Sequence, residues 1–120
     1  MIKIGILGSS GRVGSLLIDD LKNDTEAKVS CVHVFDKIEK VLPPDTVVTN
    51  DINVLFEQSD VIIDFSSPVA TEELLTAVVE GGKRKPLVIA TTGLSKHQQN
   101  LLLEASKLVP ILYATNISLG

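Results

Sequence analysis

Three glycines, Gly8, Gly11 and Gly14, stand three residues apart, directly after the apolar residues 4–7 and directly before a helical pattern. Glycine permits a tight turn and lets the backbone approach a bound group closely. The first turn of a helix presents free N–H groups and the positive end of the helix dipole, and both favour an anion. The pattern therefore predicts a strand, a turn and a helix that together bind phosphate.

The spacing of these glycines is less specific than their setting. Ser10 stands where a dinucleotide-binding turn often has a second glycine, and glycines are common in purely structural turns. No Lys-Ser or Lys-Thr pair follows Gly14, which argues against a Walker-type phosphate loop. The place of the turn in the first strand–helix unit favours cofactor binding over a purely structural turn.

Asp36 and Lys37 follow the second apolar, β-branched run of the chain. A carboxylate at this point of a nucleotide-binding fold accepts hydrogen bonds from the adenine ribose hydroxyls and repels a 2′-phosphate. Lys37 offsets that repulsion, so the pair predicts that both NADH and NADPH are accepted. An ordinary charged strand end is the alternative interpretation.

Two polar segments, residues 64–68 and 91–93, also follow apolar strands. In an open parallel sheet, ligands bind at the edge formed by the carboxyl ends of the strands. Hydroxyl and N–H groups there can contact diphosphate, ribose or nicotinamide. Turn and cap chemistry explains the same residue types equally well, so both interpretations stay open.

The elements that position these residues alternate between strand and helix. Val54, Leu55 and Gln58 are predicted to form the inner edge of a short helix capped by Asp51. Repeated alternation of strand and helix predicts an α/β fold, a Rossmann-type doubly wound parallel sheet of about six strands. We expect strands at residues 4–7, 28–35, 46–49, 61–65, 87–90 and 111–114, and helices at residues 12–22, 51–58, 68–80 and 95–108.

Composition limits the classes of function. The 120 residues suit one domain, and 44% hydrophobic with 3% aromatic residues predicts an aliphatic core. A net charge of −4 argues against binding to nucleic acid or an acidic membrane surface, and the run Lys83, Arg84, Lys85 is expected to be a solvated turn. No run resembles a signal peptide or reaches the length of a membrane span.

The histidines and the cysteine give no sign of a metal site or a nucleophile. His33 is expected to be packed in or at the edge of a strand, and His97 to be exposed near a helix start. Cys31 is the only cysteine, so no intramolecular disulfide can form, which fits a reducing cytoplasm. Its strand position predicts a small buried hydrophobic residue.

Together these motifs resemble the 4-hydroxy-tetrahydrodipicolinate reductase (dihydrodipicolinate reductase) family of the diaminopimelate route to lysine. Residues 4–14, 61–71, 90–94 and 114–120 match the family's segments in the family's order. Ala90 departs from the family by replacing a usual glycine, and Ile117 by replacing a usual phenylalanine. The resemblance implies NAD(P)H-dependent reduction of 4-hydroxy-tetrahydrodipicolinate to tetrahydrodipicolinate.

The resemblance also assigns the parts of the cofactor to parts of the chain. It places the diphosphate at residues 10–13, the ribose end at Asp36 and Lys37, and the nicotinamide near Phe65 and residues 91–93. It places Asn116 where the chain crosses to the substrate domain. The expected cofactor-binding residues are Gly8, Ser10, Gly11, Arg12, Val13, Gly14, Asp36, Lys37, Phe65, Ala90, Thr91, Thr92, Gly93 and Asn116.

The family also has a second domain, which binds substrate, donates the proton and forms the usual homotetramer. We expect residues 1–120 to be the NAD(P)-binding domain without that second domain, to contain no catalytic residue, and to bind NADH or NADPH weakly without turnover. An S-adenosylmethionine methyltransferase is one alternative, although Gly14 and residues 91–93 argue against it. A nucleotide-sensing module that is not an enzyme is the other.

Overall fold

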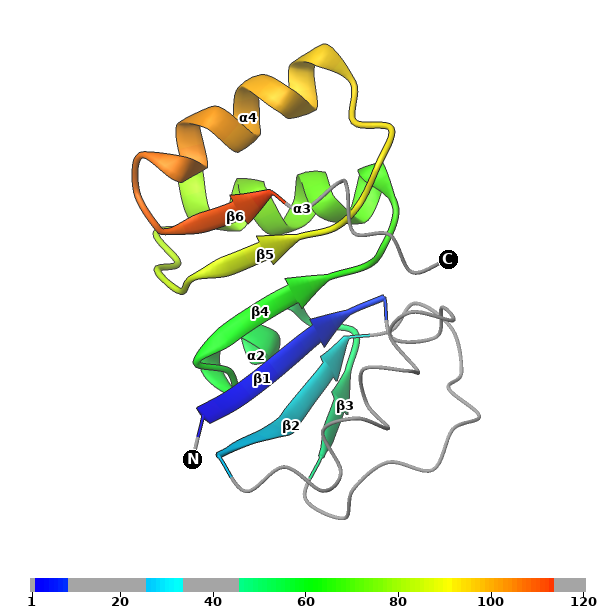
Figure 1. Cartoon of the computed structure of the whole chain (residues 1–120), viewed down its shortest axis with the longest axis vertical. Coiled ribbons are helices and arrows are strands. Elements are labelled where there is room, and N and C mark those ends of the chain that lie inside the picture. Colours follow the sequence, from blue (N-terminus) through cyan, green and yellow to red (C-terminus); the bar gives the residue numbers. More distant parts are fainter. Residues whose placement is uncertain (1, 9–25, 34–45, 114–120) are drawn as a thin grey trace.

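The computed structural model describes residues 2–8, 26–33 and 46–113, and within them six strands form one parallel sheet. The strand order is β3-β2-β1-β4-β5-β6, and every neighbouring pair is parallel (Figure 1). This order reverses direction between β1 and β4, as in a doubly wound nucleotide-binding fold. The predicted fold class is therefore confirmed. The strands are β1 (Ile2–Leu7), β2 (Ala27–His33), β3 (Val47–Thr49), β4 (Val61–Asp64), β5 (Leu87–Ile89) and β6 (Ile111–Tyr113).

Three helices are described, α2 (Ile52–Glu57), α3 (Pro68–Val79) and α4 (Lys96–Ser106). Each helix is preceded by a capping residue whose side chain accepts a hydrogen bond from a backbone N–H of the first turn. That N–H has no acceptor within the helix itself. These caps are Asp51, Ser67 and Ser95. Proline is favoured at the first helical position because its fixed φ suits the helix and it has no N–H to satisfy, and Pro68 stands there in α3.

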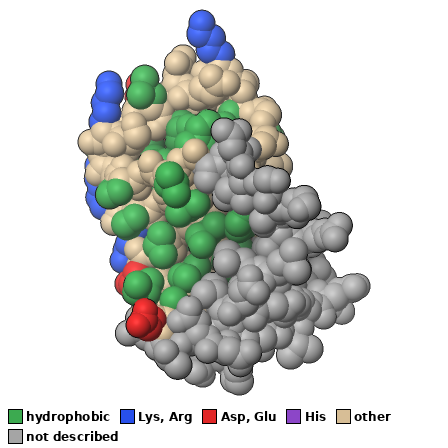
Figure 2. All heavy atoms as spheres, in the orientation of Figure 1, with side chains coloured by type: hydrophobic (Ala, Val, Ile, Leu, Met, Phe, Trp, Pro, Cys, Tyr) green, Lys and Arg blue, Asp and Glu red, His purple; other side chains and the backbone are tan. Residues whose placement is uncertain are grey.

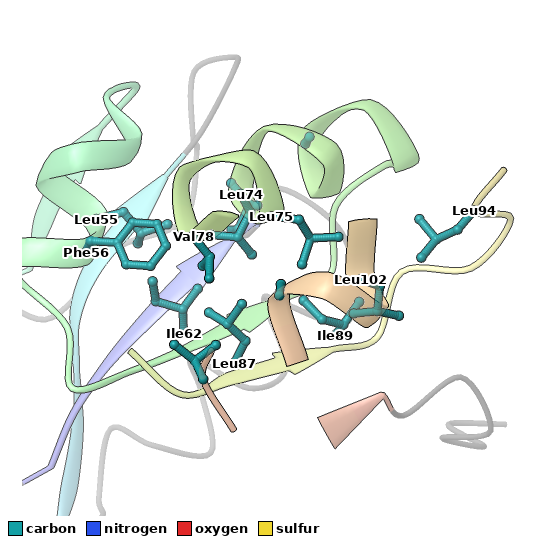
Figure 3. Close-up of a cluster of buried hydrophobic side chains, with 14 of the residues drawn as sticks. Leu55, Phe56, Ile62, Leu74, Leu75, Val78, Leu87, Ile89, Leu94 and Leu102 are labelled. Atoms are coloured by element: carbon teal, nitrogen blue, oxygen red, sulfur yellow. The ribbon is translucent and has the colours of Figure 1, made fainter. Parts of the chain in front are cut away.

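All three helices pack on one face of the sheet, where they bury the larger of two apolar clusters. Figure 3 shows Leu74, Leu75 and Val78 of α3 directed at Ile62 and Leu87 of the sheet. Alternate residues of a strand point to opposite faces, so the second cluster lies on the other side. Its buried members are Ile4, Ile6, Val29 and Val32, with Val61 and Ile63 packed against them.

The surface in the orientation of Figure 1 is apolar near its middle. Figure 2 shows hydrophobic side chains gathered there, with Lys and Arg side chains along the outer margins. Among the exposed large hydrophobic residues, Leu112 of β6 is 62% exposed and Leu103 of α4 is 60% exposed. The edge of the sheet at β6 therefore carries apolar side chains in contact with solvent.

One packing prediction is wrong, and several boundaries shift. Gln58 is exposed and ends α2, while Phe56 is 2% exposed and packs in the core beside Leu55. A helix of six residues has fewer than two turns, so periodicity defines its inner face poorly. Strand β4 ends at Asp64 and α4 ends at Ser106. The helix expected at residues 12–22 lies outside the described residues.

Candidate functional site

The carboxyl ends of β1, β4 and β5 meet at one edge of the sheet. Asp64 pairs with Leu7 on one side and with Ile89 on the other, so the three strands end at the same level. The N–H of Phe65 donates to the carbonyl of Leu7 at 2.9 Å, and the N–H of Ala90 donates to the carbonyl of Asp64 at 2.9 Å. The residues after the three strands therefore lie side by side, at the point where the strand order reverses.

Gly8 is fixed at this edge by a close approach of backbone. Its φ is +86°, and its N–H donates to the carbonyl of His33 at 3.2 Å. A Cβ added at Gly8 would lie 2.7 Å from the Cα of Ser66 and 2.8 Å from the carbonyl oxygen of Phe65. Only glycine fits both the positive φ and the approach, so the turn after β1 and the turn after β4 are in direct contact.

The side chain of Asp64 ties the ends of the strands to α3. It is fully buried, and its Oδ1 accepts from the N–H of Ser66 at 2.9 Å and from the hydroxyl of Thr91 at 3.0 Å. Oδ1 also accepts from the hydroxyl of Ser66, and Oδ2 accepts from the hydroxyl of Thr71. One carboxyl group thus joins β4, the first turn of α3 and the segment after β5.

Burial separates the residues that follow β5. Thr91 is 3% exposed and held by Asp64, whereas Thr92 and Gly93 are exposed. Gly93 has a φ of +78°, and no atom lies within 4 Å of the Cβ that alanine would add. Phe65 is half-buried. Phe65, Ala90, Thr92 and Gly93 are therefore the residues here that a ligand can reach.

The structure thus brings together the expected site residues Gly8, Phe65, Ala90 and Thr91, with Thr92 and Gly93 next in the chain. It does not test the expectations for the phosphate loop, the ribose end or the crossing point. The expected residues outside the described part of the chain are Ser10, Gly11, Arg12, Val13, Gly14, Asp36, Lys37 and Asn116.

Asp64 stands in the expected segment 64–68 and Thr71 in the segment 61–71 that resembles the family, but the sequence alone assigns no individual role to either residue. A strand places alternate side chains on one face, so Asp64 shares the face of buried Ile62, under α3. That parity, with an acidic residue ending an apolar strand, was the available signal. The contacts with Thr71 and Thr91 depend on how α3 and β5 approach β4.

The remaining candidates have structural surroundings. Burial raises the pKa of the Cys31 thiol to about 11, and a hydrogen bond with the Val32 backbone lowers it in part. His33 is buried in β2, which lies between β1 and β3 and so is not an edge strand, and His97 is exposed. In the part of the chain that the structure describes, no three His, Cys, Asp or Glu side chains gather as a metal site. No helix in that part is long and apolar enough to span a membrane.

Two surface hollows lie away from this edge of the sheet. One, of about 280 Å³, is lined by α4 and β6, with Leu102, Ile111 and Tyr113 among its residues. The other, of about 210 Å³, is lined by Phe56 and Glu57 of α2 and by the turn that contains Arg84. Of the expected cofactor-binding residues that the structure describes, none lines either hollow.

Known structures match this fold at low sequence identity. A dipicolinate-bound dihydrodipicolinate reductase from Paenisporosarcina sp. TG-14 matches with a TM-score of 0.72 and 19% identity, over 92% of this chain and 46% of that one. A Plasmodium falciparum pyrroline carboxylate reductase with NADP bound matches with a TM-score of 0.59 and 19% identity, over 91% and 38% of the two chains. These likenesses support the fold.

Sequence comparisons are more specific. The chain is 76% identical over its whole length to the 4-hydroxy-tetrahydrodipicolinate reductase of Aliarcobacter butzleri, and 56% identical to that of Nitratiruptor sp.. It spans 47% and 46% of the lengths of these relatives. The family model described as "Dihydrodipicolinate reductase, N-terminus" matches residues 2–117. The chain therefore belongs to the dihydrodipicolinate reductase family and corresponds to its N-terminal domain.

Proposed function

We propose that this chain binds NADH or NADPH across the carboxyl edge of β1, β4 and β5. The observation that carries the proposal is the contact between the turns after β1 and β4, which Gly8 makes possible at the reversal of strand order. In doubly wound folds this reversal is where a dinucleotide lies. Membership of the family, by the match over residues 2–117, supports the same cofactor class.

The described residues fit such a cofactor. Gly8 has the positive φ that suits a tight turn after β1, and exposed Thr92 and Gly93 border the neighbouring half of the edge. We assign the diphosphate to Ser10, Gly11, Arg12, Val13 and the flanking Gly14, and the adenine ribose to Asp36 and Lys37. We assign the nicotinamide half to Phe65, Ala90, Thr91, Thr92 and Gly93, with Asn116 at the crossing to a substrate domain.

The contribution of this chain is orientation. The reduced nicotinamide, when bound, supplies a hydride from its C4 atom, and that chemistry belongs to the cofactor. In this proposal Gly8 lies in the part that holds the diphosphate, and half-buried Phe65 with the exposed segment at residues 92–93 would hold the ring. Fixing the geometry before reaction removes part of the entropic barrier.

For the whole protein we propose NAD(P)H-dependent reduction of 4-hydroxy-tetrahydrodipicolinate to tetrahydrodipicolinate in diaminopimelate and lysine biosynthesis. The relatives that match all 120 residues have this name, and the chain spans about half of their length. Substrate binding and proton donation would come from the remaining half. We extend the proposal to a cytoplasmic homotetramer that does not bind nucleic acid or membranes. The net charge of −4 disfavours binding to these acidic partners.

Titration of the chain with NADH, NADPH and S-adenosylmethionine tests the binding proposal. We expect enhanced fluorescence of reduced nicotinamide with both dinucleotides and no heat of binding with S-adenosylmethionine. Binding of S-adenosylmethionine alone would favour the methyltransferase alternative. We also expect no steady-state reduction of substrate by the 120-residue chain, so turnover by this chain would contradict the assignment of catalysis to the remaining half.

A Lys37→Ala variant tests the proposed acceptance of both cofactors. Removing the lysine leaves the charge of Asp36 unopposed, so the affinity for NADPH should fall relative to that for NADH. Dissociation constants for both cofactors, measured at one salt concentration, give the ratio. An unchanged ratio would show that Lys37 does not offset the repulsion of the 2′-phosphate.

A further inference from the structure

Asp64 lies at the centre of a cluster of polar side chains that also contains Ser66, Thr71 and Thr91. We propose that Asp64 is a positioning residue for the nicotinamide ring of the cofactor, acting through the segments at residues 65–66 and 91–93. This inference rests on the proposed function. Asp64 itself is fully buried, so its effect must pass through the groups that it holds.

The hydrogen bonds of Asp64 reach the two segments that border one half of the sheet edge. Ser66 donates through its N–H at 2.9 Å and through its hydroxyl, and Thr91 donates through its hydroxyl at 3.0 Å. Thr71, from the first turns of α3, donates to the second carboxyl oxygen. The half-buried Phe65 lies between Asp64 and Ser66 in the chain, and the exposed Thr92 directly follows Thr91. Asp64 therefore sets the separation of the exposed groups.

The location in the sheet decides which half of a dinucleotide is affected. A doubly wound sheet has two mononucleotide-binding halves, and the glycine turn after β1 belongs to the half that takes the adenosine diphosphate. Asp64 ends β4, the first strand of the other half, and its partners lie after β4 and β5 (Figure 1). The nicotinamide ring is thus the part of the cofactor that Asp64 would position.

The direction of the hydrogen bonds supports the same assignment. A hydroxyl has one proton, and Ser66, Thr71 and Thr91 each donate theirs to Asp64. The Ser66 hydroxyl also lies 3.4 Å from the Ser67 carbonyl and 3.5 Å from the Thr71 hydroxyl, both longer contacts. Thr71 and Thr91 are buried, so of these three hydroxyls only that of half-buried Ser66 can face a ligand. Toward a ligand it offers lone pairs, which suit a donor such as the nicotinamide carboxamide. They do not suit phosphate oxygens, which only accept.

Binding of NADH and of ADP-ribose by the whole protein tests the inference, because ADP-ribose lacks the nicotinamide. In Asp64→Asn we expect the NADH affinity to fall by about tenfold or more, while the ADP-ribose affinity stays within about twofold. The enhancement of reduced-nicotinamide fluorescence should fall with it, because the ring is no longer fixed. Asp60→Asn is the matched control: its carboxylate accepts from the Lys3 N–H at 2.9 Å, just before β4 begins and so at the opposite edge of the sheet.

Thr71→Val keeps the inference testable if Asp64→Asn does not fold. Thr71 is buried in α3 and donates to Asp64, and valine keeps its shape. A smaller loss of NADH affinity, again without loss of ADP-ribose affinity, is expected. Thr46→Val is its control, since the Thr46 hydroxyl donates to the Val29 carbonyl at 3.1 Å, far along the sheet from β4.

Two results would overturn the inference. Equal losses of NADH and ADP-ribose affinity would assign Asp64 a purely structural role, and unchanged affinities would assign it none at the cofactor site. In both cases the unsubstituted protein still binds ADP-ribose, so the proposed function stands. Failure of the unsubstituted protein to bind either compound would overturn the proposed function and this inference together.

Discussion

Replacing Gly8 with alanine is unfavourable for two reasons, the backbone conformation and a steric clash. Alanine disfavours a φ of +86°, and its Cβ would lie 2.7 Å from the Cα of Ser66, which is backbone and cannot rotate away. We expect Gly8→Ala to lower the free energy of unfolding by about 2–4 kcal/mol, combining the left-handed strain with overpacking. Thermal unfolding followed by circular dichroism measures the change.

Gly82→Ala is the matched control for that prediction. Gly82 has a φ of +72°, but no atom lies within 4 Å of the added Cβ, so only the left-handed strain remains. A loss of about 1 kcal/mol is expected there. Equal losses at the two glycines would mean that the contact between the turns after β1 and β4 has no energetic weight.

The buried thiol of Cys31 predicts a pH dependence. Burial raises the pKa of this thiol to about 11 in the folded state. In the unfolded state the pKa is about 8.5, so the unfolded thiol loses its proton at a lower pH. Between these values the unfolded state binds fewer protons, and stability therefore falls as the pH rises. Urea unfolding at several pH values from 8 to about 10.5 should show a shallower fall in Cys31→Ala than in the parent. Parallel curves would contradict the raised pKa.

The start of α4 is held by more than its own cap. The Ser95 hydroxyl accepts from the Gln98 N–H at 3.2 Å, and the Gln98 side chain accepts from the Ser95 N–H at 2.8 Å. The Gln98 amide also donates to the Pro68 carbonyl at 3.2 Å and to the Glu72 carboxylate at 3.3 Å, which ties α4 to the start of α3. Both of these hydrogen bonds between the starts of α3 and α4 therefore depend on the Gln98 side chain.

A comparison of Ser95→Ala with Gln98→Ala measures that dependence. Ser95→Ala removes a cap and should cost about 1 kcal/mol of unfolding free energy. Gln98→Ala should cost more, about 2 kcal/mol, because it also removes the donor to two half-buried acceptors of α3. Ser106→Ala, at the exposed end of α4, is the control with a small effect. If Ser95→Ala proved the costlier change, the tie to α3 would contribute little.

At the scale of elements, features set by residues close in sequence were predictable, whereas features set by contacts between distant residues were less so. Asp51, Ser67 with Pro68, and Ser95 each mark a helix start, because a cap acts within one turn of its own residue. The end of α3 was less predictable. Arg84 donates to the Val78 carbonyl at 2.7 Å, so part of the expected solvated turn closes the helix, and that bond depends on how the chain folds back.

The candidate site also has a part that the sequence predicts and a part that depends on tertiary packing. The sequence located the ends of β4 and β5 at one edge, because parallel strands align their carboxyl ends. It did not show that Asp64 faces inward to bind Thr71 and Thr91, since those three residues meet only after α3 and β5 have packed. Strand order and side-chain parity follow from general rules, whereas the partners of a buried carboxyl group follow from the particular packing.

For the whole molecule, the apolar surface at the β6 edge predicts dye binding and association of the 120-residue chain. Leu103 and Leu112 are 60% and 62% exposed, so lysine at both positions should change the free energy of unfolding by less than about 1 kcal/mol. A charged edge strand also resists pairing with another chain. We expect lower fluorescence of a hydrophobic dye and less light scattering. A large loss of stability would show that these side chains are buried in solution.

β1 is synthesised before β2 and β4, but it lies between them in the sheet and so acquires its second neighbour only later. Ile4 pairs with Val29 on one side but with Val61 on the other, and the Lys3 N–H reaches Asp60 across 57 residues of chain. Contacts of such separation form late, because the loop must close first. While the ribosome is still translating residues up to 64, one side of an apolar strand has no neighbour. A nascent chain stalled before β4 would therefore expose, as its most aggregation-prone segment, the strand that the finished sheet encloses on both sides.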